Sequence, residues 1–204
     1  MTTSGVRAVV LAAGAGRRFG GDKLLAPLRG RPLLDHALAI LRRAERERLI
    51  DGVVVVAPAG DHPVVRLALE AGCRAVAHRV PAAPLSHSIR LGLQSLAGTG
   101  AAAALVALGD QPAIRIEVVR ALVEAWRAGA GPVVRPRYAD APTEPGHPLL
   151  LDRSLWPRAA ELEGDAGFGP LLRRYPGWVT LVDVPGANPD IDTTADLGGF
   201  EESG

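Results

Sequence analysis

The sequence is poor in cysteine, in net charge and in long apolar runs, and each shortage excludes a class of protein. The single cysteine, Cys73, cannot form an intramolecular disulfide or a cysteine-rich zinc site. A formal net charge of +1 with 48% hydrophobic residues excludes a disordered chain and a general nucleic-acid binder. No apolar run approaches the roughly 20 residues that span a bilayer. We therefore expect a cytoplasmic protein that binds neither nucleic acid nor membrane.

Lysine is equally scarce: it occurs once, at position 23, whereas arginine is abundant. This lysine closes a loop that follows an apolar run at residues 6–12. The loop holds several glycines and cations, namely Gly14, Gly16, Gly20, Gly21, Arg17, Arg18 and Lys23. Bare backbone N–H groups beside positive side chains are typical of polyphosphate binding.

Apolar runs alternate with helical patterns along the chain, which predicts a mostly parallel sheet covered on both faces. We expect strands at residues 6–12, 53–57, 74–77, 102–108, 133–135, 149–151 and 179–184. We expect helices at residues 32–41, 64–71, 86–96, 114–128, 154–162, 168–175 and from 193 or 194 to 197. The fold class is thus α/β, a Rossmann-like three-layer sandwich in one domain, residues 1–204. Residues 1–112 would mainly bind a nucleotide and residues 113–204 mainly an acceptor.

Three interpretations compete for the glycine loop. A Walker loop needs Gly-Lys-Ser or Gly-Lys-Thr, but Lys23 lies between Asp22 and Leu24, so that interpretation fails. A dinucleotide fingerprint needs a third glycine where the chain has Phe19, and no acidic residue ends the strand at 53–57, so it is weak. A plain glycine-rich turn remains open, because the chain has 24 glycines.

The segment Leu11-Ala12-Ala13-Gly14-x-Gly16-x-Arg18-x-Gly20-x-x-Lys23 resembles the signature of the MobA-like NTP transferase family. The resemblance implies the nucleotide-diphospho-sugar transferase type of fold and a loop that wraps a nucleoside triphosphate. Arg18 and Lys23 would then neutralise the phosphates, and Gly14 and Gly16 would admit them to the backbone. Position 16 is often serine in the family, so a side-chain contact would be missing here. The matching residues Leu11, Ala12 and Ala13 become nucleotide-binding candidates.

Two acidic segments complete the resemblance. Asp110 in Gly-Asp-Gln-Pro follows the strand at 102–108, and a lone aspartate there is commonly a turn or cap residue. The same four residues resemble the family's metal-binding motif, which implies that Asp110 binds Mg2+ and takes part in catalysis with Arg18 and Lys23. Asp190-Ile191-Asp192-Thr193-Thr194-Ala195-Asp196-Leu197 fits a helix capping box and also resembles a family segment that brings a second carboxylate to the metal. Asp192 is assigned that role, with Asp190 as the alternative.

Three further matches concern the substrates. Gly146-His147-Pro148 resembles a segment that lines the acceptor side in cofactor cytidylyltransferases, and Asp165 in Gly-Asp-Ala-Gly resembles another such element. Ser86 and Ser88 resemble a serine-rich turn that contacts the nucleotide, although either serine would also serve as a helix cap. Gly146, His147 and Asp165 are therefore acceptor-binding candidates, whereas His147 could equally be an exposed loop residue.

The resemblance implies an Mg2+-dependent nucleotidyltransferase. The motifs are most similar to the cytidylyltransferase branch, which transfers CMP from CTP to molybdopterin with release of pyrophosphate. The alternatives are cytidylyl, uridylyl or guanylyl transfer to another small phosphorylated acceptor, and a nucleotide-binding maturation factor that delivers a cofactor to a molybdoenzyme client without catalysis.

Overall fold

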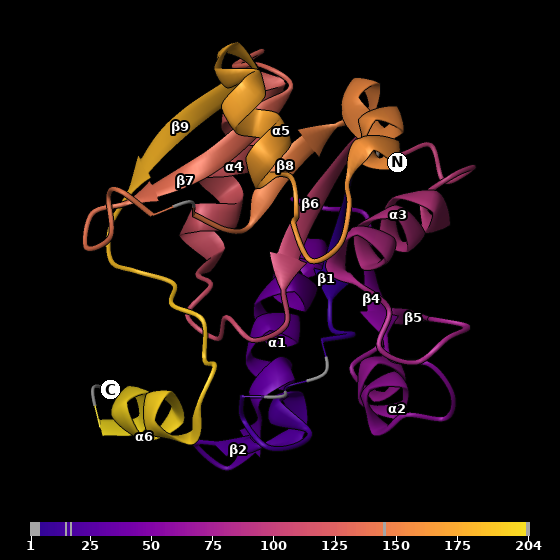
Figure 1. Ribbon diagram of the computed structural model, residues 1–204. Helices are drawn as coiled ribbons and strands as arrows, with labels where there is room; N and C mark the ends of the chain where they lie inside the picture. Colours follow the sequence, from indigo (N-terminus) through magenta and orange to yellow (C-terminus); the bar gives the residue numbers. More distant parts are fainter. Residues whose placement is uncertain (1–4, 15, 17, 145, 203–204) are drawn as a thin grey trace.

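A seven-stranded sheet runs through the molecule in the order β5-β4-β1-β6-β8-β7-β9. The computed structural model describes residues 5–14, 16, 18–144 and 146–202 (Figure 1). The strands are β1 (Val6–Leu11), β4 (Val53–Ala57), β5 (Arg74–Ala77), β6 (Ala103–Leu108), β7 (Val133–Tyr138), β8 (Leu149–Asp152) and β9 (Val179–Val184). Every neighbouring pair is parallel except the two pairs that β8 makes with β6 and β7. The expected mostly parallel α/β sheet is confirmed.

Helices cover both faces of this sheet, because β1 is apolar on both sides. Val6, Ala8 and Val10 of β1 belong to a core cluster shared with α1 (Leu33–Arg46), α2 (Pro63–Glu70) and α4 (Ile116–Arg127). Val9 and Leu11 belong to a second cluster shared with α3 (Leu85–Ser95), the 3-10 helix η2 (Arg153–Glu161) and α5 (Gly169–Arg174). The continuous apolar pattern of β1 is what a strand buried on both faces requires.

The structure departs from the sequence prediction at prolines. β7 continues through Pro136 to Tyr138 beside β9, whereas β8 pairs only with Val133 and Val134. Pro136 thus lies in a part of β7 that has one neighbouring strand instead of two, where proline is better tolerated. The helix expected at 154–162 is 3-10 rather than α and contains Pro157. A small hairpin of β2 (Pro27–Leu28) and β3 (Arg31–Pro32) precedes α1, and short 3-10 helices η1 (Lys23–Leu25) and η3 (Pro176–Trp178) were not predicted.

The cap of α3 is also different from the expected one. Neither serine caps the helix: the Ser86 hydroxyl has no hydrogen-bond partner among the described residues, and the Ser88 hydroxyl lies 2.9 Å from His78 Nε2. Instead, the N–H of Leu85 donates to Asp165 Oδ1 at 3.1 Å, and the N–H of Ser86 donates to the Gly164 carbonyl at 3.1 Å. The prediction that Ser86 or Ser88 caps this helix was wrong, because a loop distant in sequence supplies the acceptors.

The C-terminal segment returns to the N-terminal half of the chain. Figure 1 shows α6 (Thr194–Glu202) beside the β2 hairpin. Ile191 is 1% exposed and packs with Leu28 and Leu33, next to half-buried side chains of Phe19, Leu197 and Phe200. The N–H of Ile191 donates to the Asp110 carbonyl at 3.0 Å. This return brings residues 190–192 to the sheet edge where β6 ends.

The capping box at the start of α6 is confirmed. Asp196 Oδ2 accepts from the backbone N–H groups of Asp192 and Thr193 at 2.9 and 2.7 Å, and the Asp196 N–H donates to Thr193 Oγ1 at 3.2 Å. Within the described part of the chain no helix is long and apolar enough to cross a membrane.

Candidate active site

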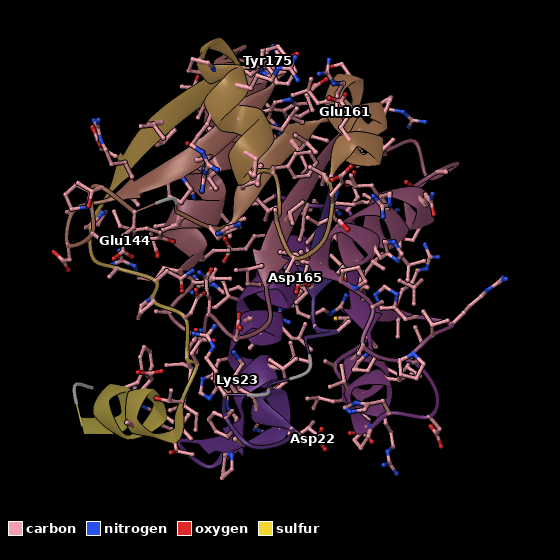
Figure 2. All side chains as sticks on the ribbon, in the orientation of Figure 1. Asp22, Lys23, Glu144, Glu161, Asp165 and Tyr175 are labelled. Atoms are coloured by element: carbon pink, nitrogen blue, oxygen red, sulfur yellow. The ribbon has the colours of Figure 1, made fainter. Side chains whose placement is uncertain are left out.

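A cavity of about 490 Å³ opens where β1 and β6 end. Its lining residues come from the glycine loop and η1, the ends of both strands and the residues just after β6, the loop before α3, the start of α3 and the loop after η2: Leu11, Ala13, Gly14, Gly16, Arg18, Lys23, Leu24, Ala82, Ala83, Leu85, Ser88, Leu108, Asp110 and Asp165. Figure 2 labels Lys23, the first residue of η1, and Asp165, in the loop after η2; both line this cavity. The carboxyl edge of a parallel sheet is the expected place for a ligand.

Gly16 has a conformation that explains the departure from serine at this position. Its φ is +55°, and a Cβ added there would lie 2.5 Å from the Gly21 carbonyl oxygen. A serine is therefore excluded without a change of the loop backbone. At Gly14, by contrast, an added Cβ would have no atom within 4 Å, so this position of the loop has room for a side chain. Arg17, one of the predicted loop cations, lies outside the described residues.

Lys23 joins the two carboxylates that were expected to share a metal. Its Nζ lies 2.7 Å from Asp110 Oδ2 and 3.0 Å from Asp192 Oδ1. Arg18 Nη2 contacts the other oxygen of Asp192 at 3.0 Å. Burial disfavours the ammonium charge, but the hydrogen bonds and charges of Asp110 and Asp192 outweigh it and raise the pKa of Lys23. The lysine is therefore charged at neutral pH and held between two acids from distant parts of the chain.

This arrangement fits a divalent cation. Asp110 Oδ2 and Asp192 Oδ1 converge on one positive atom, and carboxylate oxygens are the ligands that Mg2+ and Mn2+ prefer. A bound ion would need the ammonium to move aside. Among the residues that the structure describes, no group of three or more His, Cys, Asp or Glu side chains is placed to hold a metal. The ion would therefore complete its coordination with phosphate and water.

Asp190 takes part in a different set of contacts. Its Oδ1 accepts from Gln111 Nε2 at 2.8 Å, and Gln111 Oε1 accepts from Asn188 Nδ2 at 3.0 Å. Asn188 Nδ2 also donates to the His147 carbonyl at 3.2 Å. Burial and then the negative charge of Asp110 raise the pKa of Asp190. The two aspartates on either side of Ile191 thus face different partners.

A second cavity, of about 480 Å³, adjoins the first at Leu108. It is lined by Leu108, Gln111, Tyr138, Ala141, Glu144, Gly146, His147, Ala187, Asn188, Pro189 and Asp190. Burial, with the charge of Arg135, lowers the pKa of His147 to about 4, so this imidazole is neutral at pH 7. Tyr138 Oη donates to the His147 carbonyl at 2.8 Å and holds the loop against the cavity.

The structure brings most predicted site residues together. Gly146 and His147 line the second cavity, whereas Asp165 lines the first and not the second. Ala12 is fully buried in the core and Ser86 is 1% exposed, and neither lines the first cavity. Gln111 and Asn188 were missed: Gln111 lay within the quoted Gly-Asp-Gln-Pro segment, but nothing in the sequence marks Asn188.

Comparison with known proteins identifies relatives over nearly the whole chain. The model of the MobA-like NTP transferase domain matches residues 8–190. The nicotine blue oxidoreductase of Paenarthrobacter nicotinovorans is 35% identical over 94% of both chains. A probable molybdenum cofactor guanylyltransferase of Thermococcus kodakarensis is 33% identical over 68% of this chain and 62% of that protein.

Solved structures agree with these matches. Rv0371c of Mycobacterium tuberculosis superposes with a TM-score of 0.82 at 30% identity, covering 100% of both chains. A manganese complex of Rv0371c superposes with a TM-score of 0.77 at 27% identity, covering 98% of this chain and 99% of the other. A divalent metal therefore occurs in a relative with the same fold.

Proposed function

The chain belongs to the MobA-like NTP transferase family, and from this premise we propose that it transfers a nucleoside monophosphate, CMP from CTP, to the terminal phosphate of molybdopterin or the molybdenum cofactor. One observation carries the proposal. Lys23, Arg18, Asp110 and Asp192 meet at the edge of a cavity large enough for a nucleotide. The family is one of nucleotidyltransferases, whereas the base, the acceptor and the metal belong to the proposal.

In the proposed reaction an oxygen of the acceptor phosphate attacks the alpha-phosphorus in line, and pyrophosphate leaves. The acceptor phosphate is already ionised, so no general base is required. Arg18 and Lys23 would hold the leaving pyrophosphate and balance its charge, while the glycine loop orients the triphosphate. For this, the Lys23 ammonium must pass from the carboxylates to the phosphates when substrate binds.

Asp110 and Asp192 would hold the metal, for which we propose Mg2+. Bound there, the ion would offset negative charge on the alpha-phosphate. The protein's own contribution is position: Asp110 is fixed at the end of β6, and Asp192 is fixed by the capping box of α6. The roles of the remaining nucleotide-side and acceptor-side residues stay predictions, as do the cytoplasmic location and the division at residue 112.

The decisive experiment measures pyrophosphate release with each of the four ribonucleoside triphosphates, with and without molybdopterin and Mg2+. We expect the fastest release with CTP, and only when acceptor and metal are both present. Asp110→Asn should abolish release while CTP still binds. Asp183→Asn, the same change at an exposed aspartate of β9, should behave as wild type. Release with GTP alone would overturn the choice of base, and no release in any mixture would overturn the transferase.

An oxidation–reduction reaction is the second candidate, because the relative with 35% identity over 94% of both chains is named an oxidoreductase. The glycine loop argues against a dinucleotide-dependent reaction, because Phe19 occupies the position at which a dinucleotide fingerprint has its third glycine. Anaerobic mixing of the protein with nicotine blue and a reduced nicotinamide nucleotide tests it by absorbance. Turnover there without pyrophosphate release in the first experiment would favour this candidate. Saturable CTP binding with neither activity would instead favour a maturation factor that delivers a cofactor to a molybdoenzyme.

A further inference from the structure

One polar side chain in the lining of the first cavity carries no charge, and it belongs to Ser88. The other polar side chains that line this cavity among the described residues are two cations and two carboxylates, namely Arg18, Lys23, Asp110 and Asp165. The cations suit a triphosphate, so the uncharged part of the lining is left for the nucleoside. That part includes residues of the loop before α3 and of the start of α3. Ser88 is therefore the side chain placed to distinguish one base from another by a neutral hydrogen bond.

The Ser88 hydroxyl can face a base either as a donor or as an acceptor. A hydroxyl carries one proton and two lone pairs, so the group that takes the proton decides which of them faces a ligand. The choice matters for pyrimidines, because cytosine has an amino donor at the ring position where uracil has a carbonyl acceptor. An accepting hydroxyl would favour cytosine at that position, whereas a donating hydroxyl would favour uracil.

The neighbour of this hydroxyl is the imidazole of His78, the residue that follows β5. His78 Nε2 lies 2.9 Å from Ser88 Oγ, and the two residues are buried, with 9% and 4% of their surface exposed. Among the described residues, His78 is the single hydrogen-bond partner of the Ser88 hydroxyl. Burial and then the charge of His87 lower the pKa of His78, so its imidazole is neutral at pH 7. One nitrogen of a neutral imidazole can accept a hydrogen bond.

Both partners are held in place by contacts of their own backbone. The His78 N–H donates to the Ala57 carbonyl at 3.1 Å, which continues the pairing of β5 with β4 by one residue. Ser88 lies on α3, and the start of this helix is tied to the loop after η2 through Gly164 and Asp165. The contact between imidazole and hydroxyl therefore joins two fixed elements, β5 and α3 (Figure 1). An imidazole fixed in this way can set the direction of the hydroxyl proton.

We propose that His78 is a positioning residue for base selection: its Nε2 accepts the proton of the Ser88 hydroxyl, so that the Ser88 oxygen accepts a hydrogen bond from the amino group of cytosine. UTP would bind more weakly, because its carbonyl oxygen would face a lone pair of the serine oxygen. His78 does not line the first cavity and acts through Ser88 alone. The inference rests on the proposed function for the choice of CTP, and it adds a physical origin for the base preference.

Nucleotide binding, measured by isothermal titration calorimetry with Mg2+ and without acceptor, tests this role. The quantity of interest is the dissociation constant of UTP divided by that of CTP. His78→Leu should lower this ratio roughly five- to tenfold, the effect of one lost hydrogen bond, mainly by weakening CTP. His78→Gln should restore most of the ratio, because its amide oxygen can accept from Ser88. His87→Gln, at an exposed histidine of α3, should match wild type.

A double-mutant cycle separates positioning from a general effect on the fold. In the Ser88→Ala background, His78→Leu should leave the ratio unchanged, because the hydroxyl through which it acts is gone. An equal loss in both backgrounds would overturn the inference. It would also be overturned by a wild-type ratio in His78→Leu, or by a wild type that binds CTP and UTP equally.

The unmodified protein gives an independent readout of the same contact. Nitrogen magnetic resonance of isotope-labelled histidine distinguishes a protonated from a bare ring nitrogen, and the His78 signal is assigned by its loss in His78→Gln. With CTP bound, Nε2 should be bare and Nδ1 should carry the proton, whereas a proton on Nε2 would overturn the inference. These measurements need neither acceptor nor turnover. Absence of pyrophosphate release would therefore refute the transferase, while the base preference is decided by binding alone.

Discussion

Replacing Lys23 by methionine should have opposite effects on metal binding and on turnover. In the nucleotide-free protein the ammonium occupies the point where Asp110 and Asp192 converge, at 2.7 and 3.0 Å. A divalent ion must displace it. Lys23→Met removes the competitor and keeps a side chain of similar length, so Mn2+ should bind more tightly. The same variant loses a cation needed for the phosphates, so turnover should fall by roughly 10²–10³-fold.

The size of the metal effect follows from the two contacts. A charge-assisted hydrogen bond contributes about 1.5–3 kcal/mol, and the two aspartate side chains are 25% and 31% exposed, so solvent reduces each contact. Taking about 1 kcal/mol for each gives about 2 kcal/mol, which corresponds to roughly 30-fold tighter Mn2+ binding.

Mn2+ binding is measured by electron paramagnetic resonance of the free ion at low and high salt. Arg18→Met is the matched control: it removes the same charge, but Arg18 is 76% exposed and, within the described part of the chain, forms an ion pair with Asp192 and not with Asp110. We expect it to change the affinity less than about threefold. If Lys23→Met binds Mn2+ no better than wild type, or if Arg18→Met gives the same gain, the ammonium and the ion do not compete for one place. A gain that disappears at high salt would point to a long-range charge effect instead.

Three further changes test separate features. Gly16→Ser should abolish CTP binding in calorimetry and cost about 1–3 kcal/mol of unfolding free energy through backbone strain, whereas Gly14→Ser, with open space at its Cβ, should keep the fold. Asp165→Ala should lower the free energy of unfolding in urea by about 1 kcal/mol because α3 loses its cap, and Asp165→Asn should restore most of it; equal stability of all three proteins would refute the cap. His147 has a pKa of about 4 in the folded protein against an ordinary value of 6.5. Between these two pH values the unfolded chain binds more protons than the folded protein, so the free energy of unfolding falls as the pH drops through that window. His147→Gln should flatten this part of the pH dependence, and an unchanged slope would contradict it.

The regular part of the fold was predictable because its signals are local. The strands at 53–57, 74–77 and 179–184 have the predicted bounds, since each is a short segment rich in valine or alanine between turn residues or helices. The β2 hairpin is too short for periodicity to reveal. Its turn residues, Arg29 and Gly30, both have positive φ, but only the glycine is a residue type from which positive φ would be predicted.

The site was predictable only in part, for a physical reason. Asp110 and Lys23 could be placed at one sheet edge because both follow adjacent parallel strands. The contact of Asp192 with Lys23 depends on the burial of Ile191 against Leu28 and Leu33, a tertiary contact that no local pattern encodes. The hydrogen-bonding roles of the Gln111 and Asn188 amides were missed for the same reason, because their partners are distant in the sequence.

Because the C-terminal segment returns to the glycine loop only after the sheet is complete, the sheet can be intact while the active site lacks a residue. The sheet is finished with β9 at Val184, and Asp192 comes afterwards, on a connection that passes Asn188. A protease that cut this connection would leave every strand paired, yet the lysine of the glycine loop would lose one of its two counter-charges. The strand signal in circular dichroism would then persist although the active site is incomplete and Leu28 and Leu33 have lost the cover of Ile191. Preparations of this protein are therefore better judged by intact mass than by their sheet content.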